Sequence, residues 1–196
     1  MTEHYFSKVP VSSFNLRKVK FIINHMEYEF YTGAGIFSNN KLDFGTRVLI
    51  ENMKIKEEDD VLDLGCGLGV VGRIVANVTK GKVILVDINK RAVKLSKMNT
   101  KGLKNVEVFQ GDQYEAVEEK KFDVILLNPP QTAGKKVCLA MIQKAIDHLK
   151  KGGSLQMVAR HNKGGETLSK YMIEIFGNME TLVREGGYRV YMSIKE

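Results

Sequence analysis

The sequence predicts an α/β fold organised around a doubly wound, mostly parallel β-sheet. From Asp60 onward, short apolar runs alternate with segments of helical periodicity, and this alternation is typical of parallel sheets with helices on both faces. The strand segments are almost continuously apolar, as expected for strands buried on both sides. The chain ends in two strands separated by Gly186-Gly187, a two-residue hairpin turn that makes the last strand antiparallel to its neighbour.

The predicted elements follow from where the apolar periodicity changes along the chain. The strands of the main sheet are predicted at Val61–Leu64, Val83–Val86, Val106–Phe109, Phe122–Leu127, Leu155–Ala159, Thr181–Arg184 and Tyr188–Ile194. The helices are predicted at about Val70–Asn77, Asn89–Lys101, Lys135–Leu149 and Glu166–Phe176. Lys151-Gly152-Gly153 follows the third of these helices and is a good helix-ending signal.

The N-terminal part differs in pattern, so we divide the chain into an appendage, residues 1–59, and a main domain, residues 60–196. Val19–Ile23 and Met26–Tyr31 are separated by two residues and predict a β-hairpin. A short helix is predicted at about Asp43–Asn52. This segment is too short to build much core of its own, so we expect it to pack on the main sheet.

Length and composition exclude several classes of protein. At 196 residues the chain can form one domain with a substantial core. Two cysteines can form neither a disulfide framework nor a four-ligand zinc site, and the histidines show no metal-ligand spacing, so no metal is expected. No run approaches about 18 apolar residues and no signal-peptide pattern is present, so we expect a cytoplasmic protein without membrane contact. The formal net charge of +7 permits a polyanionic partner.

A glycine-rich segment, Asp63 to Gly69, lies between the first strand of the main sheet and the helix that follows. Glycines there let the backbone turn sharply and approach a ligand, while the helix N-terminus offers unpaired N–H groups. Asp87 closes the next strand, where a carboxylate can accept both hydroxyls of a ribose. Together these features predict a nucleoside-containing ligand. The residues expected to bind it are Asp63, Gly65, Cys66, Gly67, Gly69, Asp87, Ile88, Gly111, Asp112 and Asn128.

Two cofactors are compatible with these glycines. Gly67 to Gly72 also satisfies the dinucleotide pattern G-x-G-x-x-G, with Asp87 in range, so an NAD-dependent oxidoreductase remains an alternative. S-adenosylmethionine is favoured because Asp63 lies inside the strand, where its carboxylate can bind the methionine amino group directly or through water. Gly111-Asp112 follows the third strand and is positioned for the adenine amino group.

Asn128-Pro129-Pro130 ends the fourth strand. Two successive prolines are in themselves a common strand terminator. In a doubly wound sheet, however, the first and fourth strands are neighbours at the topological switch point, so this turn and the glycine segment face one crevice. The Asn128 side-chain carbonyl and the Pro129 backbone carbonyl can each accept one hydrogen of an NH2 group and aim its lone pair at a sulfonium methyl. Asn128, Pro129 and Pro130 are therefore the predicted catalytic residues.

Together, these motifs resemble the class I S-adenosylmethionine-dependent methyltransferases that modify exocyclic or amide nitrogens. Gly35-Ile36-Phe37-Ser38 and Leu42-Asp43-Phe44-Gly45-Thr46 are similar to the segment that leads into the "methyltransferase small" domain of the small-subunit ribosomal RNA guanine-N2 methyltransferases. The resemblance covers about Tyr31 to the end, and it implies a seven-stranded Rossmann-like methyltransferase sheet with an antiparallel last strand. It also implies that Phe37 and Ser38 lie near the active site, and that Asp43 and Thr46 lie close to the cofactor.

Two departures from this family concern the substrate. The residue after Asn-Pro-Pro is often an aromatic that stacks on a flipped base or a planar amide. Here it is Gln131, so either another residue such as Phe37 or Tyr31 supplies the stacking, or the site holds its target differently. Bacterial members also carry an N-terminal half that helps to bind RNA and has no counterpart in this sequence, so we expect the N-terminal segment, a partner or a second copy to contribute.

Basic residues beside the predicted crevice are candidates for contacts with RNA phosphates. They are Lys135, Lys136, Arg160, His161 and Lys163, to which Lys8, Arg17, Lys18 and Lys20 could add. A lysine stripe from Lys90 to Lys104 flanks the cofactor end instead, and fits an ordinary solvated helix face.

The sequence thus predicts an enzyme that transfers a methyl group from S-adenosylmethionine to an exocyclic amino nitrogen of RNA, with a guanine of small-subunit ribosomal RNA as the target that fits best. Two further alternatives remain beside the oxidoreductase. One is methylation of a protein glutamine amide, which uses the same Asn-Pro-Pro geometry, and the other is a non-catalytic RNA-binding protein on the same fold. The target nucleotide, the choice between naked RNA and an assembled subunit, and the oligomeric state are not predicted.

Overall fold

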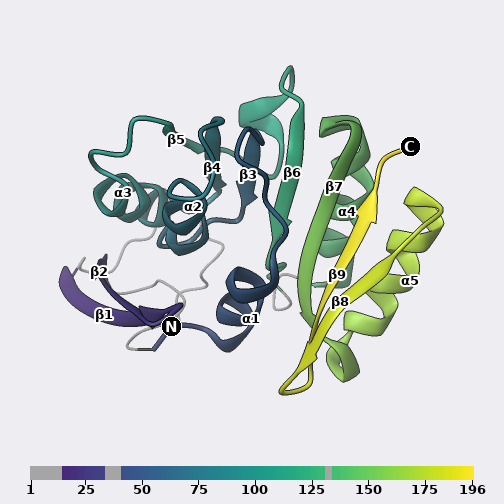
Figure 1. Cartoon of the computed structure of the whole chain (residues 1–196), viewed down its shortest axis with the longest axis horizontal. Helices are drawn as coiled ribbons and strands as arrows, with labels where there is room; N and C mark the ends of the chain where they lie inside the picture. The colour runs from purple at the N-terminus through teal and green to yellow at the C-terminus, as the bar shows by residue number, and fades with distance from the viewer. Residues whose placement is uncertain (1–14, 34–40, 131–133) are drawn as a thin grey trace.

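A computed structural model describes residues 15–33, 41–130 and 134–196, and confirms the predicted fold class (Figure 1). The main sheet has seven strands in the order β5-β4-β3-β6-β7-β9-β8. Their bounds are β3 Val61–Leu64, β4 Val83–Asp87, β5 Val106–Gln110, β6 Phe122–Leu127, β7 Leu149–Arg160, β8 Glu180–Glu185 and β9 Tyr188–Ile194. β3 pairs in parallel with both β4 and β6, so the strand order reverses at β3.

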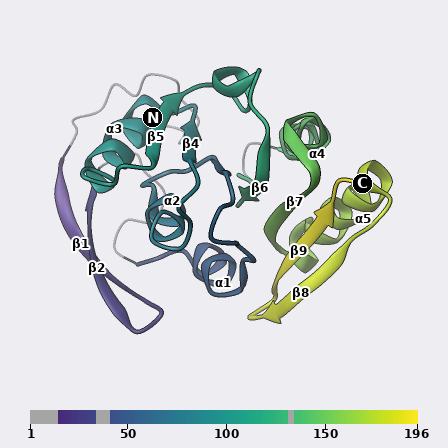
Figure 2. The same cartoon turned by 45° about the horizontal axis from the view of Figure 1, so that its top comes forward.

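Helices cover both faces of this sheet (Figures 1 and 2). Their bounds are α1 Phe44–Asn52, α2 Val70–Val75, α3 Lys90–Asn99, α4 Lys135–His148 and α5 Gly165–Phe176. Alternate residues of β3 point to opposite faces. Val61 packs in the apolar cluster beneath α1, α2 and α3, and Leu62 packs in the cluster beneath α4 and α5. Two apolar layers therefore hold the sheet from both sides.

The last two strands form the expected hairpin. Glu185 pairs with Tyr188 across the turn, and Gly186 and Gly187 have φ angles of +54° and +81°, the left-handed conformation that two-residue hairpin turns favour. β9 lies between β7 and β8 and is antiparallel to both. The turn therefore projects from the same edge of the sheet as the carboxyl end of β7.

The seventh strand in chain order, β7, begins earlier than predicted. It starts at Leu149, directly after α4, rather than at Leu155. Phe122 pairs with Leu149 and Val124 pairs with Ser154, so β7 contains extra residues opposite β6 and the segment between them bulges. Gly152 adopts a φ of +78° within this bulge. The glycines that predicted a helix end thus form a β-bulge, which breaks the period-two pattern on which strand prediction depends.

An N-terminal hairpin of β1 (Arg17–Ile23) and β2 (Met26–Thr32) lies beside α2 and α3, away from α5 (Figure 1). Phe21, Ile23 and Phe30 are buried in the same apolar cluster as Val61. The Asn99 side chain, at the end of α3, accepts a hydrogen bond from the backbone N–H of Tyr31 at 2.7 Å. It also donates to the carbonyl oxygens of Tyr31 at 3.0 Å and of Leu68 at 2.9 Å. One buried amide therefore ties the hairpin to the glycine-rich loop.

We expect Asn99→Ala to lower the free energy of unfolding by about 2–4 kcal/mol, because it leaves buried backbone groups without partners. Urea unfolding measures the change. Asn77→Ala is a matched control, since the Asn77 side chain is exposed and donates to the Arg73 carbonyl four residues earlier, and it should cost less than about 1 kcal/mol. Equal losses for the two variants would contradict the bridging role of Asn99.

Candidate functional site

The carboxyl ends of three neighbouring strands converge on one cavity. Leu64 at the end of β3 pairs with Val86 of β4 and with Leu127 of β6. The residues that follow, Gly65, Asp87 and Asn128, therefore emerge at the same edge of the sheet. The cavity at this edge has a volume of about 580 Å³, within the range typical of small-molecule sites.

The glycine-rich loop forms one wall of the cavity. Gly65, Gly67 and Gly69 have φ angles of +79°, +55° and +76°, a conformation that glycine adopts without strain. Gly65 and Gly67 line the cavity, whereas Gly69 is not among its described lining residues. A Cβ at Gly69 would lie 2.3 Å from Ser96 Oγ, so this glycine allows α3 to approach the loop. Gly65 and Gly67 therefore shape the cavity wall, whereas Gly69 makes room for α3.

Asp87 shapes the loop from the adjacent strand. Its side chain is 3% exposed. One carboxylate oxygen accepts from the backbone N–H of Gly67 at 2.9 Å, and the other accepts from that of Asn89 at 2.8 Å. These hydrogen bonds compensate for burying the charge. Gly111, after β5, donates its N–H to the Asp87 carbonyl at 3.1 Å, which brings the β5 end to the same cavity.

Asp63 is a second buried carboxyl group, inside β3 and 5% exposed. Its Oδ2 accepts from the backbone N–H of Gly72 at 3.0 Å. Burial raises the pKa of the Asp63 carboxyl to about 7, and the negative charge of Asp87 adds to this while the Gly72 hydrogen bond opposes it. Asp63 lines the cavity, so a cation placed there would favour its ionised form.

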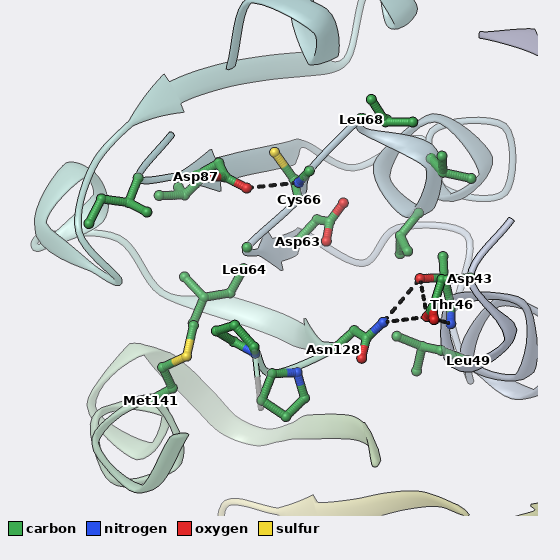
Figure 3. A pocket seen from close by; sticks show the side chains of 18 of the residues that line it. Asp43, Thr46, Leu49, Asp63, Leu64, Cys66, Leu68, Asp87, Asn128 and Met141 are labelled. Atoms are coloured by element: carbon green, nitrogen blue, oxygen red, sulfur yellow. Dashed lines mark hydrogen bonds between the residues drawn. The ribbon is translucent and has the colours of Figure 1, made fainter. Parts of the chain in front are cut away.

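The Asn128 side chain is fixed in one orientation by the first turn of α1 (Figure 3). Its Nδ2 donates to Asp43 Oδ2 and to Thr46 Oγ1, each at 3.0 Å. A carboxylate can only accept, and the Thr46 hydroxyl already donates its proton to Asp43 Oδ2 at 3.1 Å. Both partners therefore require the NH2 group of Asn128 on their side. No described residue donates to Asn128 Oδ1, which is left as an acceptor.

Most of the predicted catalytic and cofactor residues lie together at this cavity. Its lining includes Asp63, Gly65, Cys66, Gly67, Asp87, Ile88, Gly111, Asp112, Asn128, Pro129 and Pro130. Phe37, Ser38 and Gln131 lie outside the described residues. Four of the predicted basic contacts are exposed and do not line the cavity itself. Lys135 and Lys136 lie at the start of α4, Arg160 at the end of β7, and Lys163 in the turn that follows β7.

Sequence reasoning missed Tyr188, which is the aromatic residue among the described lining of the cavity. Tyr31, suggested for stacking, lies on the hairpin beneath the Lys18 ammonium and is not part of that lining. The Tyr188 ring packs against Phe44, with ring centroids 5.5 Å apart. A Cβ at Gly45 would lie 3.0 Å from Tyr188 Cε1. Nothing local in the sequence marks Tyr188, because its contacts come from a helix far away in the chain.

Cys66 is a buried free thiol in the loop. Burial raises the pKa of the Cys66 thiol, which keeps it protonated and suited to packing rather than to nucleophilic chemistry. Across residues 15–33, 41–130 and 134–196, no cluster of three His, Cys, Asp or Glu side chains is arranged to hold a metal ion. In the same ranges, no helix is both long and apolar enough to cross a bilayer.

The sequence model of one known family matches residues 27–192, which include the cavity and all but the last two residues of the seven-stranded sheet. That family is the methyltransferase small domain. The chain belongs to this family. It is thus a methyltransferase domain of the class that uses S-adenosylmethionine, as the loop and the Asn-Pro-Pro turn predicted.

The relatives of this chain differ in length. An uncharacterised protein of Bacillus subtilis, YbxB, is 34% identical over 200 residues, and the match covers 100% of both chains. The ribosomal RNA small subunit methyltransferase C of Erwinia tasmaniensis is 33% identical over 171 residues, 84% of this chain and 48% of that protein. The chain therefore spans about half the length of the ribosomal RNA methyltransferases that it matches.

A solved structure shows the same relation. The Thermus thermophilus 16S rRNA N2 G1207 methyltransferase (RsmC), in complex with AdoMet and guanosine, superposes with a TM-score of 0.82 and 26% sequence identity. The match covers 95% of this chain and 52% of that one. A methyltransferase from Pyrococcus furiosus superposes with a TM-score of 0.67 at 19% identity, which supports the fold alone.

We expect the Asp63 carboxyl to titrate near pH 7 in the cofactor-free protein. Because this folded-state pKa lies above the unfolded value of about 3.9, the contribution of Asp63 to stability is full below that value and is lost as pH rises toward 7. Carboxyl-carbon NMR measures the titration directly, and urea unfolding at several pH values measures the stability.

Asp63→Asn cannot ionise, so this variant should lack the part of the stability decline that Asp63 causes. Asp147→Asn changes an exposed aspartate on α4 and should leave the decline in place. A titration of Asp63 below about pH 5 would show that its environment is more polar than its burial implies.

Proposed function

We propose that this protein transfers a methyl group from S-adenosylmethionine to an exocyclic amino nitrogen of RNA, and that a guanine of small-subunit ribosomal RNA is the target. The observation that carries the proposal is the orientation of Asn128, whose NH2 group is held by Asp43 and Thr46. Its Oδ1 is thereby kept available to accept a hydrogen bond from an amino group. Acceptors fixed in advance in this way need no reorganisation during the reaction.

The cavity offers groups that match each part of the cofactor. The Asp63 carboxyl, buried and within the lining, is suited to the methionine ammonium. The Asp87 carboxylate, at the end of β4, is suited to the ribose hydroxyls, and Asp112 to the adenine amino group. When bound, S-adenosylmethionine supplies a methyl group on a positively charged sulfur, which is the electrophile.

The residues of the Asn128-Pro129-Pro130 turn act on the nucleophile. An exocyclic amine is a poor nucleophile because its lone pair is delocalised into the ring. Asn128 Oδ1 and the Pro129 carbonyl oxygen each accept one amine hydrogen, which holds the nitrogen pyramidal and directs its lone pair into the cavity. The same two oxygens stabilise the positive charge that develops on the nitrogen, and the surplus proton leaves to water after the methyl group has been transferred, so no strong base is needed.

Two observations support a nucleobase as the carrier of that amine. Tyr188 gives the cavity wall an aromatic ring, on which a planar base can stack. This ring can serve the purpose of the aromatic residue that often follows Asn-Pro-Pro, a position that is Gln131 here. The Thermus thermophilus enzyme that superposes with this chain was solved with guanosine. Methylation of a protein glutamine amide uses the same Asn-Pro-Pro geometry, and for that reason the experiment compares both substrates.

Incubation with radiolabelled S-adenosylmethionine and with naked ribosomal RNA, small ribosomal subunits or release factors tests the proposal. We expect label in RNA. Asn128→Ala should lower the rate of methyl transfer at least about 100-fold, because it removes a hydrogen-bond acceptor for the transition state. Its affinity for S-adenosylhomocysteine, measured by calorimetry, should stay near that of the wild type. Asn52→Ala, which removes an amide at the far end of α1, is the matched control.

The alternatives give different results in the same experiment. Label in protein alone would indicate a glutamine amide and reject the RNA substrate. RNA binding without any transfer would indicate a non-catalytic RNA-binding protein. If Asn128→Ala abolished cofactor binding instead of transfer, the catalytic residues would be wrongly placed.

Thr46 is proposed as a positioning residue that acts through Asn128. Thr46→Val keeps the shape of the side chain but removes the oxygen that accepts from Asn128 Nδ2. We expect kcat to fall about tenfold, the equivalent of one hydrogen bond of about 1.4 kcal/mol, with little change in the KM for S-adenosylmethionine. Thr46→Ser retains the hydroxyl and should recover most of kcat. A loss of stability without a change in kcat would contradict this role.

A further inference from the structure

A second, smaller cavity adjoins the first at Tyr188. It has a volume of about 210 Å³ and is formed by the β8–β9 turn and by the segment after β7. Its lining residues are His161, Asn162, Arg184, Glu185, Gly186, Gly187, Tyr188 and Arg189. Tyr188 lines both cavities. The carboxyl end of β7 and the turn after β8 meet here, held together by a hydrogen bond from the His161 N–H to the Gly187 carbonyl at 2.9 Å.

The charge of this second cavity is unbalanced toward positive. Arg184 and Arg189 are directly paired across β8 and β9, so their side chains leave the same face of the sheet side by side. Like charges in such a pair destabilise a sheet unless something between them compensates. Neither arginine forms a salt bridge with a carboxylate of the described residues. Arg160, at the end of β7, pairs with Tyr188 and lies on the face of the sheet opposite Arg189. Its guanidinium is 5.8 Å from the Tyr188 ring centroid, and it does not line the second cavity.

The nearby carboxylates are bound to cations outside the cavity. Glu185, which lines it, forms a salt bridge with Arg47 of α1 at 2.8 Å. Glu166 on α5 forms one with Lys170 at 2.9 Å, although it also lies within the electrostatic reach of His161 and Arg189. Arg189 also hydrogen-bonds the Tyr191 side chain, a neutral partner that leaves its positive charge uncompensated. The two paired arginines therefore keep net positive charge with which to bind an anion. A guanidinium fork matches the geometry of a phosphate group, which it can bind with two parallel hydrogen bonds.

We propose that this cavity binds a backbone phosphate of the RNA substrate, next to the nucleotide whose base enters the catalytic cavity. The proposal rests on the proposed function, because it assigns the ligand from the RNA that the catalytic cavity would methylate. Tyr188 lines both cavities, so a phosphate bound in the second cavity lies next to the cavity that holds Asn128. Phosphate contacts of this kind fix the register of a nucleic acid without reading its sequence.

The test compares RNA binding and methylation by charge variants. Arg184→Ala/Arg189→Ala should weaken RNA binding about tenfold in a filter assay with S-adenosylhomocysteine present. The slope of log K against log salt should become shallower by about 1, the value for one phosphate contact. Affinity for S-adenosylhomocysteine should not change. Arg184→Lys/Arg189→Lys keeps the charges without the planar forks and should lie between the alanine variant and the wild type.

The matched control removes two positive charges elsewhere. Lys97→Ala/Lys101→Ala changes one exposed lysine in the last turn of α3 and one just after it. This variant should keep its RNA affinity within about twofold of the wild type, because salt screens the attraction between the RNA and exposed charges far from the site. Unchanged affinity and salt slope in the double arginine variant would overturn the inference, as would an equal loss in the lysine control.

The same assay separates this inference from the proposed function. If the wild-type protein methylates RNA but the arginine variants behave like it, only the phosphate site is wrong. If the wild-type protein neither binds nor methylates RNA and labels release factors instead, the proposed function fails and the phosphate site fails with it. Thermal melting of each variant confirms that it is folded, which we expect because Arg184 is exposed and Arg189 is only partly buried.

Discussion

The parallel pairing of β3 with β4 on one side and with β6 on the other is the constraint on which the rest of the molecule depends. In parallel strands the carboxyl ends lie at one edge, so the three chain segments that leave these strands must meet. One segment is the glycine loop, one carries Asp87 and one carries Asn128. The reversal of strand order at β3 therefore places the glycine loop next to the Asn128 side chain.

That arrangement buries two carboxyl groups, and the structure stabilises them in different ways. Asp87 accepts hydrogen bonds from two backbone N–H groups, whereas Asp63 accepts a hydrogen bond from the Gly72 N–H and has its pKa raised to about 7. The free protein therefore carries an incompletely compensated group in its core. An ammonium group bound at Asp63, as proposed for the cofactor, would favour the ionised carboxylate and so relieve this cost.

The sequence was sufficient to predict the elements and the residues that follow them, because each depends on short-range signals. Apolar runs predicted β3, β4 and β6, and glycines predicted both the loop and the β8–β9 turn. The interactions that orient side chains were not predicted, because they join distant parts of the chain. Asn128 and Asp43 are separated by 85 positions, and family resemblance placed Asp43 only near the cofactor. Likewise, the β7 bulge depends on its pairing with β6.

The first turn of α1 connects the two halves of the proposed reaction. Asp43 caps the helix by accepting from the Thr46 N–H at 2.8 Å, and the same carboxylate holds the Asn128 amide. Next to it, Phe44 and Gly45 pack against Tyr188, and a Cβ at Gly186 would lie 2.6 Å from the Phe44 ring. A shift of α1 would therefore move the amide acceptor and the aromatic wall together. In the proposed reaction, the group that would activate the amine and the ring that would hold its base therefore both contact the first turn of α1.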